Sequence, residues 1–220
     1  MKNAIVVGCN AFAQMVRYYL EEENSKNVSV VAYSVEKRYI SKTIAEDGLP
    51  VLPLEDIINH AEDYDFYLAI GYSNMNKVRQ NIYNSIINVG GHIHNYQHPT
   101  AVISPLACLG IGNIIFENVV IQPNVVIGNA NILQASCSIL HHSTLGDFNF
   151  ICGGAVVNGV VNIGDRNFIG SNATLRNRVT IGSEVLIGAN AYVDHSIENE
   201  SVIVPQRSIN LNKKSSEIKI

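Results

Sequence analysis

The sequence predicts an α/β plus all-β protein, in which a small Rossmann-like N-terminal domain precedes a left-handed parallel β-helix of hexapeptide repeats. Two observations lead to this prediction. Strand-like and helix-like segments alternate over residues 1–97, which is typical of a parallel sheet covered by helices. Over residues 98–204 aliphatic residues recur every six positions instead, and residues 205–220 follow as a C-terminal tail.

Length and composition agree with a folded protein of this kind. The chain has 220 residues, of which 47% are hydrophobic, and a net charge of -4, which gives no electrostatic reason to expect nucleic acid. No apolar run reaches the roughly 18 residues of a membrane helix, and the apolar start turns to glycine too early for a signal peptide. The four cysteines form no CxxC pair, so we expect buried, reduced thiols and a cytoplasmic protein.

The elements of the first domain follow from apolar spacing and turn residues. Helices should carry an apolar residue every three or four positions, as at Val78, Ile82 and Ile86. We expect strands at residues 4–7, 28–32, 50–52 and 66–70, and helices at 14–23, 54–60 and 74–89. In such sheets ligands bind beyond the C-terminal strand ends. The candidate substrate-binding residues are therefore Gly8, Asn10, Ala11, Phe12, Tyr33, Ser34, Gly71 and Tyr72.

The first strand-to-helix turn is a weak dinucleotide fingerprint, because Gly8 is its only glycine. No acidic residue stands beside Tyr33 and Ser34 at the expected end of the second strand, which also disfavours NAD. A diphosphate held by backbone N–H groups remains compatible with this turn, as does ordinary turn geometry without a ligand. The candidate phosphate partners, which are alternatively solvated charges, are Lys37, Arg38 and Arg79.

The hexad pattern is the strongest signal in the chain. Sixteen aliphatic residues follow one another at intervals of six from Ile103 to Val193, and a mostly small residue stands four positions after each. We expect the aliphatic residue to fill a triangular prism and the small one to fit near a corner. Three hexads make a coil of eighteen residues, a period marked by glycines at 110, 128, 146, 164 and 182. The run predicts five complete coils and a partial sixth, stacked ~4.8 Å apart. Left-handedness is assigned from the repeat type. The flat faces of such a prism predict a homotrimer with clefts between subunits.

Two adjacent histidines, His141 and His142, interrupt the small and aliphatic residues of this pattern. Eighteen-residue stacking places His141 between Pro123 and Gly159, with open space expected above the ring. A neutral imidazole can accept a proton near neutral pH, and the backbone N–H of Gly159 can bind an oxyanion. The alternative is a pair of exposed histidines at a corner, as we expect for His195 three coils away.

The remaining histidines point to structure more than to chemistry. His98 precedes Pro99 at the entrance to the β-helix and is expected at a structural junction, while His92 and His94 should share one face of a strand. A zinc site between subunits would need well-separated histidines, and adjacent side chains diverge. We therefore expect no metal.

These segments resemble the bacterial nucleotide-sugar acetyltransferases, which include amino-sugar N-acetyltransferases and sialic acid O-acetyltransferases. The resemblance covers nearly the whole chain and rests on residues 48–51, 68–71, 98–103 and 141–148. It implies that His141 is the catalytic base and that Gly159 lies near the acyl carbonyl. His142 stands where the family has an acidic residue, and a second family histidine falls on Phe150.

The resemblance implies an acyltransferase that moves an acetyl group from acetyl-CoA to the amine of a nucleotide-linked amino-deoxy sugar. Direct attack, a homotrimer and a role in bacterial surface glycan biosynthesis follow from it, with no nucleic acid and no membrane insertion. The implied catalytic residues are His141, His142 and Gly159, and the implied coenzyme A contacts are Gly159, Asn158, Asn177, Ala189 and Arg207. The tail keeps only Pro205 of the family's coenzyme-binding segment. Sugar O-acetylation of the sialic acid type and a non-catalytic sugar-binding trimer are the alternatives.

Overall fold

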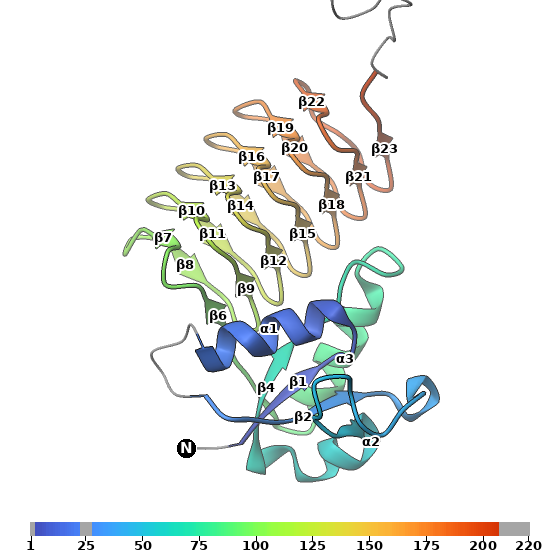
Figure 1. Ribbon diagram of the computed structural model, residues 1–220. Helices are drawn as coiled ribbons and strands as arrows, with labels where there is room; N and C mark the ends of the chain where they lie inside the picture. The colour runs from blue at the N-terminus through green and yellow to red at the C-terminus, as the bar shows by residue number, and fades with distance from the viewer. Residues whose placement is uncertain (1–2, 23–27, 207–220) are drawn as a thin grey trace, which may run out of the picture.

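The structure is a computed structural model that describes residues 3–22 and 28–206. Figure 1 shows an α/β domain from which a stack of coils rises, with helix α1 between the sheet and the first coils. The elements of the domain are β1 (Asn3–Val7), α1 (Ala11–Glu22), β2 (Val30–Val35), η1 (Lys37–Tyr39), β3 (Val51–Pro53), α2 (Leu54–Ile57), η2 (Ile58–Asp63), β4 (Tyr64–Leu68), α3 (Lys77–Asn88) and β5 (His92–Ile93).

The sheet of this domain is parallel throughout, in the order β3-β2-β1-β4-β5. Its central strand β1 is buried from Ala4 onward, and α1 turns Ala13, Val16 and Leu20 inward. These three residues recur at helical spacing, so one face of α1 covers the core. The α/β organisation predicted from alternating segments is therefore confirmed.

Several limits within the domain differ from the prediction, each for a local reason. Helix α1 begins at Ala11 instead of residue 14, because the side chain of Asn10 accepts the N–H of Ala13 at 3.2 Å and caps the helix. Strand β2 continues to Val35, because residues 33–35 pair with β3. Helix α3 begins at Lys77 instead of residue 74, because residues 74–76 have positive φ. The predicted helix at 54–60 is divided into α2 and η2 after Ile57, and His60 leaves the helical region inside η2 with φ of -131°.

The second part is a parallel β-helix with three faces of two-residue strands. Its strands are β6 (Tyr96–Gln97), β7 (Val102–Ile103), β8 (Cys108–Leu109), β9 (Ile114–Ile115), β10 (Val120–Ile121), β11 (Val126–Ile127), β12 (Ile132–Leu133), β13 (Ser138–Ile139), β14 (Thr144–Leu145), β15 (Phe150–Ile151), β16 (Val156–Val157), β17 (Asn162–Ile163), β18 (Phe168–Ile169), β19 (Thr174–Leu175), β20 (Thr180–Ile181), β21 (Leu186–Ile187), β22 (Tyr192–Val193) and β23 (Val202–Ile203). The face that runs from β6 and β9 to β23 is called the covered face below, the face from β7 to β22 the second face, and the face from β8 to β20 the third face.

From β6 to β19, each strand pairs with the strand eighteen residues later, as Ile121 does with Ile139, so the predicted coil length is confirmed. The predicted limit after residue 97 assigns β6 to the first domain, although both residues of this strand pair with β9 of the β-helix. At the far end the sixth coil is not partial, because Ile197 bridges to Ile181 and β23 pairs with β21. Ile197 follows Val193 by four positions instead of six, so the six-residue count alone loses it.

The corners have a backbone signature. Three positions after the inward aliphatic residue, the chain adopts a left-handed φ, as at Asn124 (60°), His142 (59°) and Val160 (61°). The next residue is the small one, and it is buried inside the turn, as Val125 and Ser143 are. A left-handed conformation is uncommon for residues other than glycine, so the stacked coils must hold it in place.

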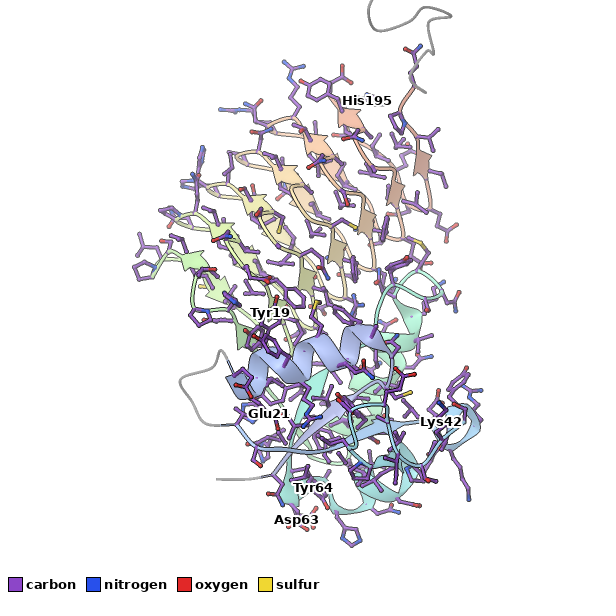
Figure 2. The ribbon with its side chains drawn as sticks, viewed as in Figure 1. Tyr19, Glu21, Lys42, Asp63, Tyr64 and His195 are labelled. Carbon is purple, nitrogen blue, oxygen red and sulfur yellow. The ribbon has the colours of Figure 1, made fainter. Side chains whose placement is uncertain are left out.

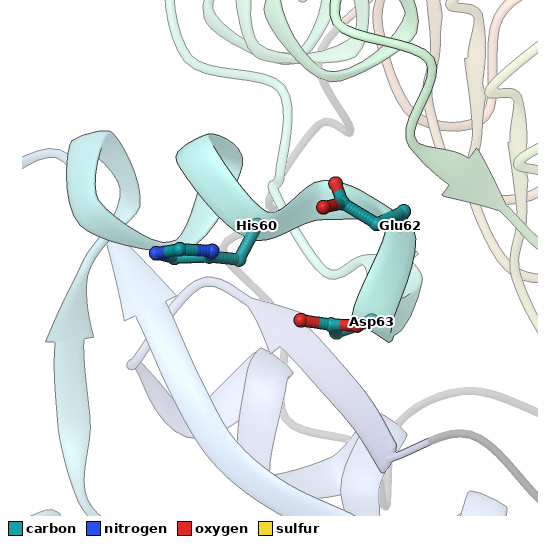
Figure 3. Close-up of side chains that lie close together, drawn as sticks. All are labelled: His60, Glu62 and Asp63. Carbon is teal, nitrogen blue, oxygen red and sulfur yellow. The ribbon is translucent and has the colours of Figure 1, made fainter.

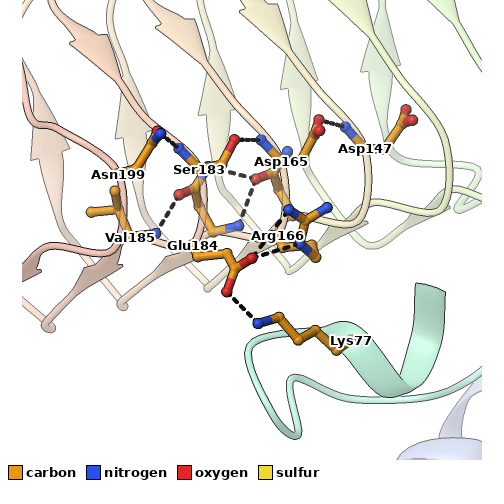
Figure 4. Close-up of polar contacts among 10 residues, drawn as sticks. Lys77, Asp147, Asp165, Arg166, Ser183, Glu184, Val185 and Asn199 are labelled. Atoms are coloured by element: carbon orange, nitrogen blue, oxygen red, sulfur yellow. Dashed lines mark hydrogen bonds and ion pairs between the residues drawn. The ribbon is translucent and has the colours of Figure 1, made fainter. Parts of the chain in front are cut away.

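The glycines of the eighteen-residue period make room for side chains of the following coil. A Cβ on Gly146 would lie 2.2 Å from the carboxylate of Asp165, which accepts the N–H of Asp147 at 2.8 Å. Figure 4 shows how this ladder continues through Ser183 and Asn199. The ladder therefore explains why the sequence has a glycine at every eighteenth position from 110 to 182.

The α/β domain packs against the covered face. Aromatic side chains of α1 and of the loop after β4 form the contact, with ring centroids 6.5 Å apart for Phe12 and Phe150 and 4.8 Å apart for Tyr72 and Phe168. Lys77, at the start of α3, binds Glu184 of the β-helix at 2.6 Å (Figure 4). The two parts therefore form one packed body.

Arg79 of α3 joins the two parts from inside and is completely buried. Its guanidinium donates to the carbonyl oxygens of Ile70, Gly71, Ala130, Phe148 and Asn149 at 2.7–3.2 Å. Burial lowers the pKa of Arg79 to about 9, which leaves the group charged at neutral pH. The prediction that Arg79 contacts a ligand phosphate is wrong, because backbone carbonyls take all of its donors.

Candidate active site

His141 and His142 lie at the corner between β13 and β14, where the second face meets the third. Both side chains are exposed in the single chain. The backbone of the neighbouring coils fixes them, since His142 N–H donates to Pro123 at 3.2 Å and the carbonyl of His141 accepts from Val160 at 2.9 Å. The predicted stacking of residues 123, 141 and 159 is therefore observed.

Gly159 is the feature that gives this corner its shape. A Cβ at this position would lie 2.6 Å from both Cε1 and Nε2 of His141, so only glycine allows the imidazole to rest here. The sequence predicts open space between the imidazole of His141 and Gly159. The imidazole instead packs directly against Gly159, which is buried. Among residues 3–22 and 28–206, the backbone N–H of Gly159 has no hydrogen-bond acceptor. A basic ring nitrogen and an unused backbone donor thus lie side by side.

The two imidazoles contact each other and a third side chain. Nδ1 of His141 lies 3.2 Å from Nδ1 of His142, with the ring planes at 83°. Nε2 of His142 lies 3.2 Å from the amide nitrogen of Asn124. Sequence reasoning missed Asn124, although the same eighteen-residue step that links His141 to Gly159 links His142 to it.

The residues expected to contact coenzyme A are only partly brought together. Asn158 and Asn177 share the corner of Gly159, and the side chain of Asn158 donates to Leu175 at 2.7 Å. Ala189 lies at a different corner, between β21 and β22. Arg207 falls outside the described residues.

Two exposed arginines, Arg176 and Arg178, flank Asn177 in the coil above Gly159. They were not singled out from the sequence. Stepping eighteen residues from Asn158 and Val160 leads directly to them. They make the upper part of this corner basic.

A hollow of about 300 Å³ lies at the C-terminal ends of β1, β2 and β4. Four of the predicted substrate-binding residues line it, namely Gly8, Asn10, Ser34 and Gly71. Ala11 lines a second hollow of about 370 Å³ that shares Cys9 and Asn10 with the first. Both open at the start of α1, whose first turn has no acidic residue, so its N–H groups favour an anion.

The other predicted residues of this group point elsewhere. Phe12 and Tyr72 pack against the covered face of the β-helix, as described above. Tyr33 is buried and donates its hydroxyl to Asp47 at 2.6 Å. Burial and this carboxylate raise the pKa of Tyr33 well above its usual range. The structure does not bring these three side chains into the hollow.

Glu36 stands at the true end of β2 and lines the first hollow together with Tyr39. The prediction that no acidic residue ends this strand is wrong, because the strand runs three residues further than expected. Carboxylates at this position of parallel α/β sheets hydrogen-bond ribose hydroxyls. The second hollow adds a lysine, Lys42, at its rim (Figure 2).

The histidines outside the corner have structural surroundings. His98 is almost fully buried, and its Nδ1 lies 2.9 Å from Thr100 Oγ1, consistent with the predicted junction. His92 and His94 are both exposed, and His94 pairs with Asp65 at 2.9 Å. His195 is exposed beside Asp194, at the far end of the coils (Figure 2).

In the part of the chain that the structure describes, one group of side chains has the chemistry and spacing to hold a metal ion. His60, Glu62 and Asp63 of η2 have ligand atoms within 4.8 Å of one another (Figure 3). All three are exposed, and Figure 2 shows Asp63 at the end of the α/β domain away from the coils. They do not contribute to either hollow or to the histidine corner.

The burial of the cysteines differs from the prediction. All four cysteines are free, but only Cys137 is buried, and Cys108 is exposed, contrary to the prediction. Burial raises the pKa of the Cys137 thiol to about 12. Within the described residues, none of the helices has the length and apolar character needed to cross a membrane.

Comparisons with known proteins bear first on the fold. The family model described as bacterial transferase hexapeptide (six repeats) matches residues 160–195. No curated protein sequence gives a significant match. The predicted fold class, a Rossmann-like domain followed by a hexapeptide-repeat β-helix, is confirmed by the structure and by solved structures that match nearly its whole length.

Particular solved structures share this architecture. A mutant of perosamine N-acetyltransferase from Caulobacter crescentus, in complex with CoA and GDP-perosamine, has 22% identity and a TM-score of 0.83, over 93% of this chain and 94% of that one. The acetyltransferase domain of PglB from Neisseria gonorrhoeae FA1090, in complex with acetyl coenzyme A, has 23% identity and a TM-score of 0.80, over 93% and 96%. WeeI from Acinetobacter baumannii AYE has 21% identity and a TM-score of 0.74, over 93% and 97%.

Proposed function

We propose that the chain is an acyltransferase that moves an acetyl group from acetyl-CoA to the amine of a nucleotide-linked amino sugar. The observation that carries this proposal is the imidazole of His141 resting on Gly159, beside an unused backbone N–H. The similar structures support the donor and acceptor classes, since they include complexes with acetyl coenzyme A and with CoA and GDP-perosamine. We place the reaction in the cytoplasm, in bacterial surface glycan biosynthesis.

The proposed chemistry is direct attack on the thioester. The sugar nitrogen forms a bond to the acyl carbon while Nε2 of His141 takes its proton. The carbonyl oxygen becomes an oxyanion that accepts a hydrogen bond from the N–H of Gly159. The carbon–sulfur bond then breaks, and the proton passes from His141 to the leaving thiolate.

The corner above Gly159 suits the remainder of coenzyme A. Amide groups of Asn158 and Asn177 can bind the pantetheine amides, which are themselves donors and acceptors. Arg176 and Arg178 stand one coil further, about 5 Å along the stack, where they can bind phosphate. Coenzyme A would thus run along one corner of the β-helix.

The acceptor fits the hollows of the α/β domain. Its diphosphate would lie at the N-terminus of α1 near Lys42, and its ribose would lie against Glu36. This domain covers one face of the prism, whereas His141 lies at the corner opposite that face. A sugar held by one copy therefore meets His141 of another copy, so the site is completed by assembly.

Exposed aliphatic side chains on the second and third faces support this homotrimer. Val102, Leu106 and Val126 are 64%, 62% and 48% exposed in the single chain. Burial of such a surface between prisms is favourable. The clefts between the prisms would then bring coenzyme A and sugar together.

The test is an activity panel with mass spectrometry. Purified protein is incubated with acetyl-CoA and amino-sugar derivatives of GDP, UDP, dTDP and CMP, and the products are examined for one added acetyl group. An acetamide on one nucleotide-sugar is the expected product. A hydroxylamine-labile ester would indicate O-acetylation instead, and failure to bind acetyl-CoA in calorimetry would indicate a non-catalytic sugar-binding protein.

A further inference from the structure

A chain of three side chains, none of them a carboxylate, begins at the proposed base. Nδ1 of His141 is 3.2 Å from Nδ1 of His142, and Nε2 of His142 is 3.2 Å from the amide nitrogen Nδ2 of Asn124. We propose that His142 and Asn124 are positioning residues that fix the tautomer of His141, a role that rests on the proposed function of His141 as base.

The tautomer matters because a neutral imidazole has one N–H and one lone pair. For Nε2 of His141 to accept a proton beside Gly159, the ring proton must sit on Nδ1. That N–H needs an acceptor, and Nδ1 of His142 is the ring nitrogen within reach. The proton of His142 must then be on Nε2, where it needs an acceptor, and the side chain within reach is Asn124.

The structure places Nδ2 of Asn124 toward Nε2 of His142, so the chain runs in this direction only after a half-turn of the amide that brings Oδ1 to His142. An amide can present its oxygen or its NH₂ group after a half-turn, with nearly unchanged distances. With the NH₂ group toward His142, every bond in the chain reverses and the proton of His141 moves to Nε2. That reversed arrangement leaves no base beside Gly159, so the direction of the chain decides activity.

The backbone holds the chain in register. His142 and Asn124 occupy the same left-handed corner position in successive coils, with φ of 59° and 60°. The N–H of His142 donates to Pro123, the neighbour of Asn124, at 3.2 Å. The two side chains are thus stacked by the ladder itself, and groups that orient a catalytic residue are usually held by such rigid elements.

A histidine at position 142 can replace the carboxylate that similar proteins have there, provided that it has a partner of its own. A carboxylate would accept the Nδ1 proton of His141 directly and need no further partner. A histidine accepts it only if its own proton is on the other nitrogen, which requires an acceptor there. The role of Asn124 therefore depends on the identity of residue 142.

That dependence gives the decisive kinetic experiment, with the full-length protein, acetyl-CoA and the nucleotide-sugar found in the activity panel. We expect His142→Leu to lower kcat on the order of 10- to 100-fold with little change in KM, and His142→Glu to keep kcat within a few-fold. Asn124→Leu should lower kcat in the parent protein but not in the His142→Glu background. Equal effects of Asn124→Leu in both backgrounds, or a change in KM alone, would overturn the relay.

A spectroscopic measurement tests the relay without any substrate. In protein labelled with ¹⁵N-histidine at alkaline pH, we expect Nδ1 of His141 to carry the proton and Nε2 to be bare, assigned by the signals lost in His141→Gln. Asn124→Leu should shift this ring toward the opposite tautomer. Asn118→Leu is the matched control, because Asn118 is an exposed asparagine with φ of 56° at another corner. A bare Nδ1 in the parent protein, or a tautomer indifferent to Asn124→Leu, would refute the relay, whereas failure of the activity panel alone would refute only the proposed reaction.

Discussion

The β-helix and the α/β domain differ in how closely sequence constrains position. In the β-helix each coil repeats the register of the last, so residues eighteen apart are in contact and His141 meets Gly159 by arithmetic. In the α/β domain, the ends of helices and strands depend on single caps, turns and pairings. The observed ends therefore differ from the predicted ones by up to three residues. The repeat therefore fixes the contact between the proposed base and Gly159, whereas the less regular domain forms the hollows that we propose for the nucleotide-sugar.

The largest expected effect is a loss of turnover without a loss of stability when His141 is replaced. His141→Ala should lower turnover about 10²- to 10⁴-fold, because the proposed general base is lost. Its thermal midpoint should stay near that of the parent, since the side chain is exposed. Steady-state rates and circular dichroism melts measure the two effects. Turnover near the parent value would show that another group is the base.

The next effect tests whether the two parts behave as one body. Arg79→Leu should lower the free energy of unfolding by about 3 kcal/mol, because buried carbonyls lose a charged donor. Chemical denaturation measures this loss. Arg38→Leu is the control, because that arginine is exposed and pairs only locally with Glu36 at 3.0 Å. Equal stability of the Arg79 variant and the parent would show that the guanidinium does not join the parts.

A smaller change displaces the base without removing it. Gly159→Ala places a Cβ 2.6 Å from the imidazole of His141, so the ring must move. We expect kcat to fall about 10²-fold, because misplacement by about 1 Å has this cost. Gly153→Ala is the control, since its nearest contact would be 3.2 Å. Equal kcat in the two variants would contradict the role of Gly159.

The α/β domain should respond in binding and not in rate. Glu36→Gln should raise KM for the nucleotide-sugar about 10-fold, the value of one hydrogen bond to a charged group, with kcat unchanged. Asp56→Asn, an exposed carboxylate outside the hollow, serves as the control. An unchanged KM with the Glu36 variant would remove the ribose contact from the account.

The smallest effect lies at the junction of the two parts. The side-chain hydrogen bond from Lys77, with a further one from Arg166, lowers the pKa of Glu184 despite some desolvation. A depressed carboxyl pKa stabilises the fold above the unfolded pKa and loses this effect as pH falls through the folded value. The midpoint difference between the parent and Glu184→Gln should therefore be present at neutral pH and vanish in acid. A difference independent of pH would mean that the carboxylate charge is not involved.

The same comparison shows what sequence could and could not predict. The hexads gave the coil length, the inward residues and the contact of residues 141 and 159, because one periodic rule governs them all. The same eighteen-residue step from His142 and from Asn158 leads to Asn124 and Arg176, so both could have been predicted from the sequence. Glu36 was missed because the end of β2 depends on pairing with β3, a long-range contact. Arg79 was misassigned because its burial depends on where α3 docks against the coils, which no local pattern reveals.

Subunit complementation tests the central claim most directly, that His141 of one copy acts on a sugar held by another. His141→Ala and Asn10→Trp, which fills the hollow of the α/β domain, are each expected to be inactive, and the two chains are then co-expressed with different tags and purified together. Clefts that pair an intact hollow from one chain with an intact His141 from the other should recover a substantial part of the parent turnover. Mixed oligomers with no more activity than either variant alone would contradict the shared site.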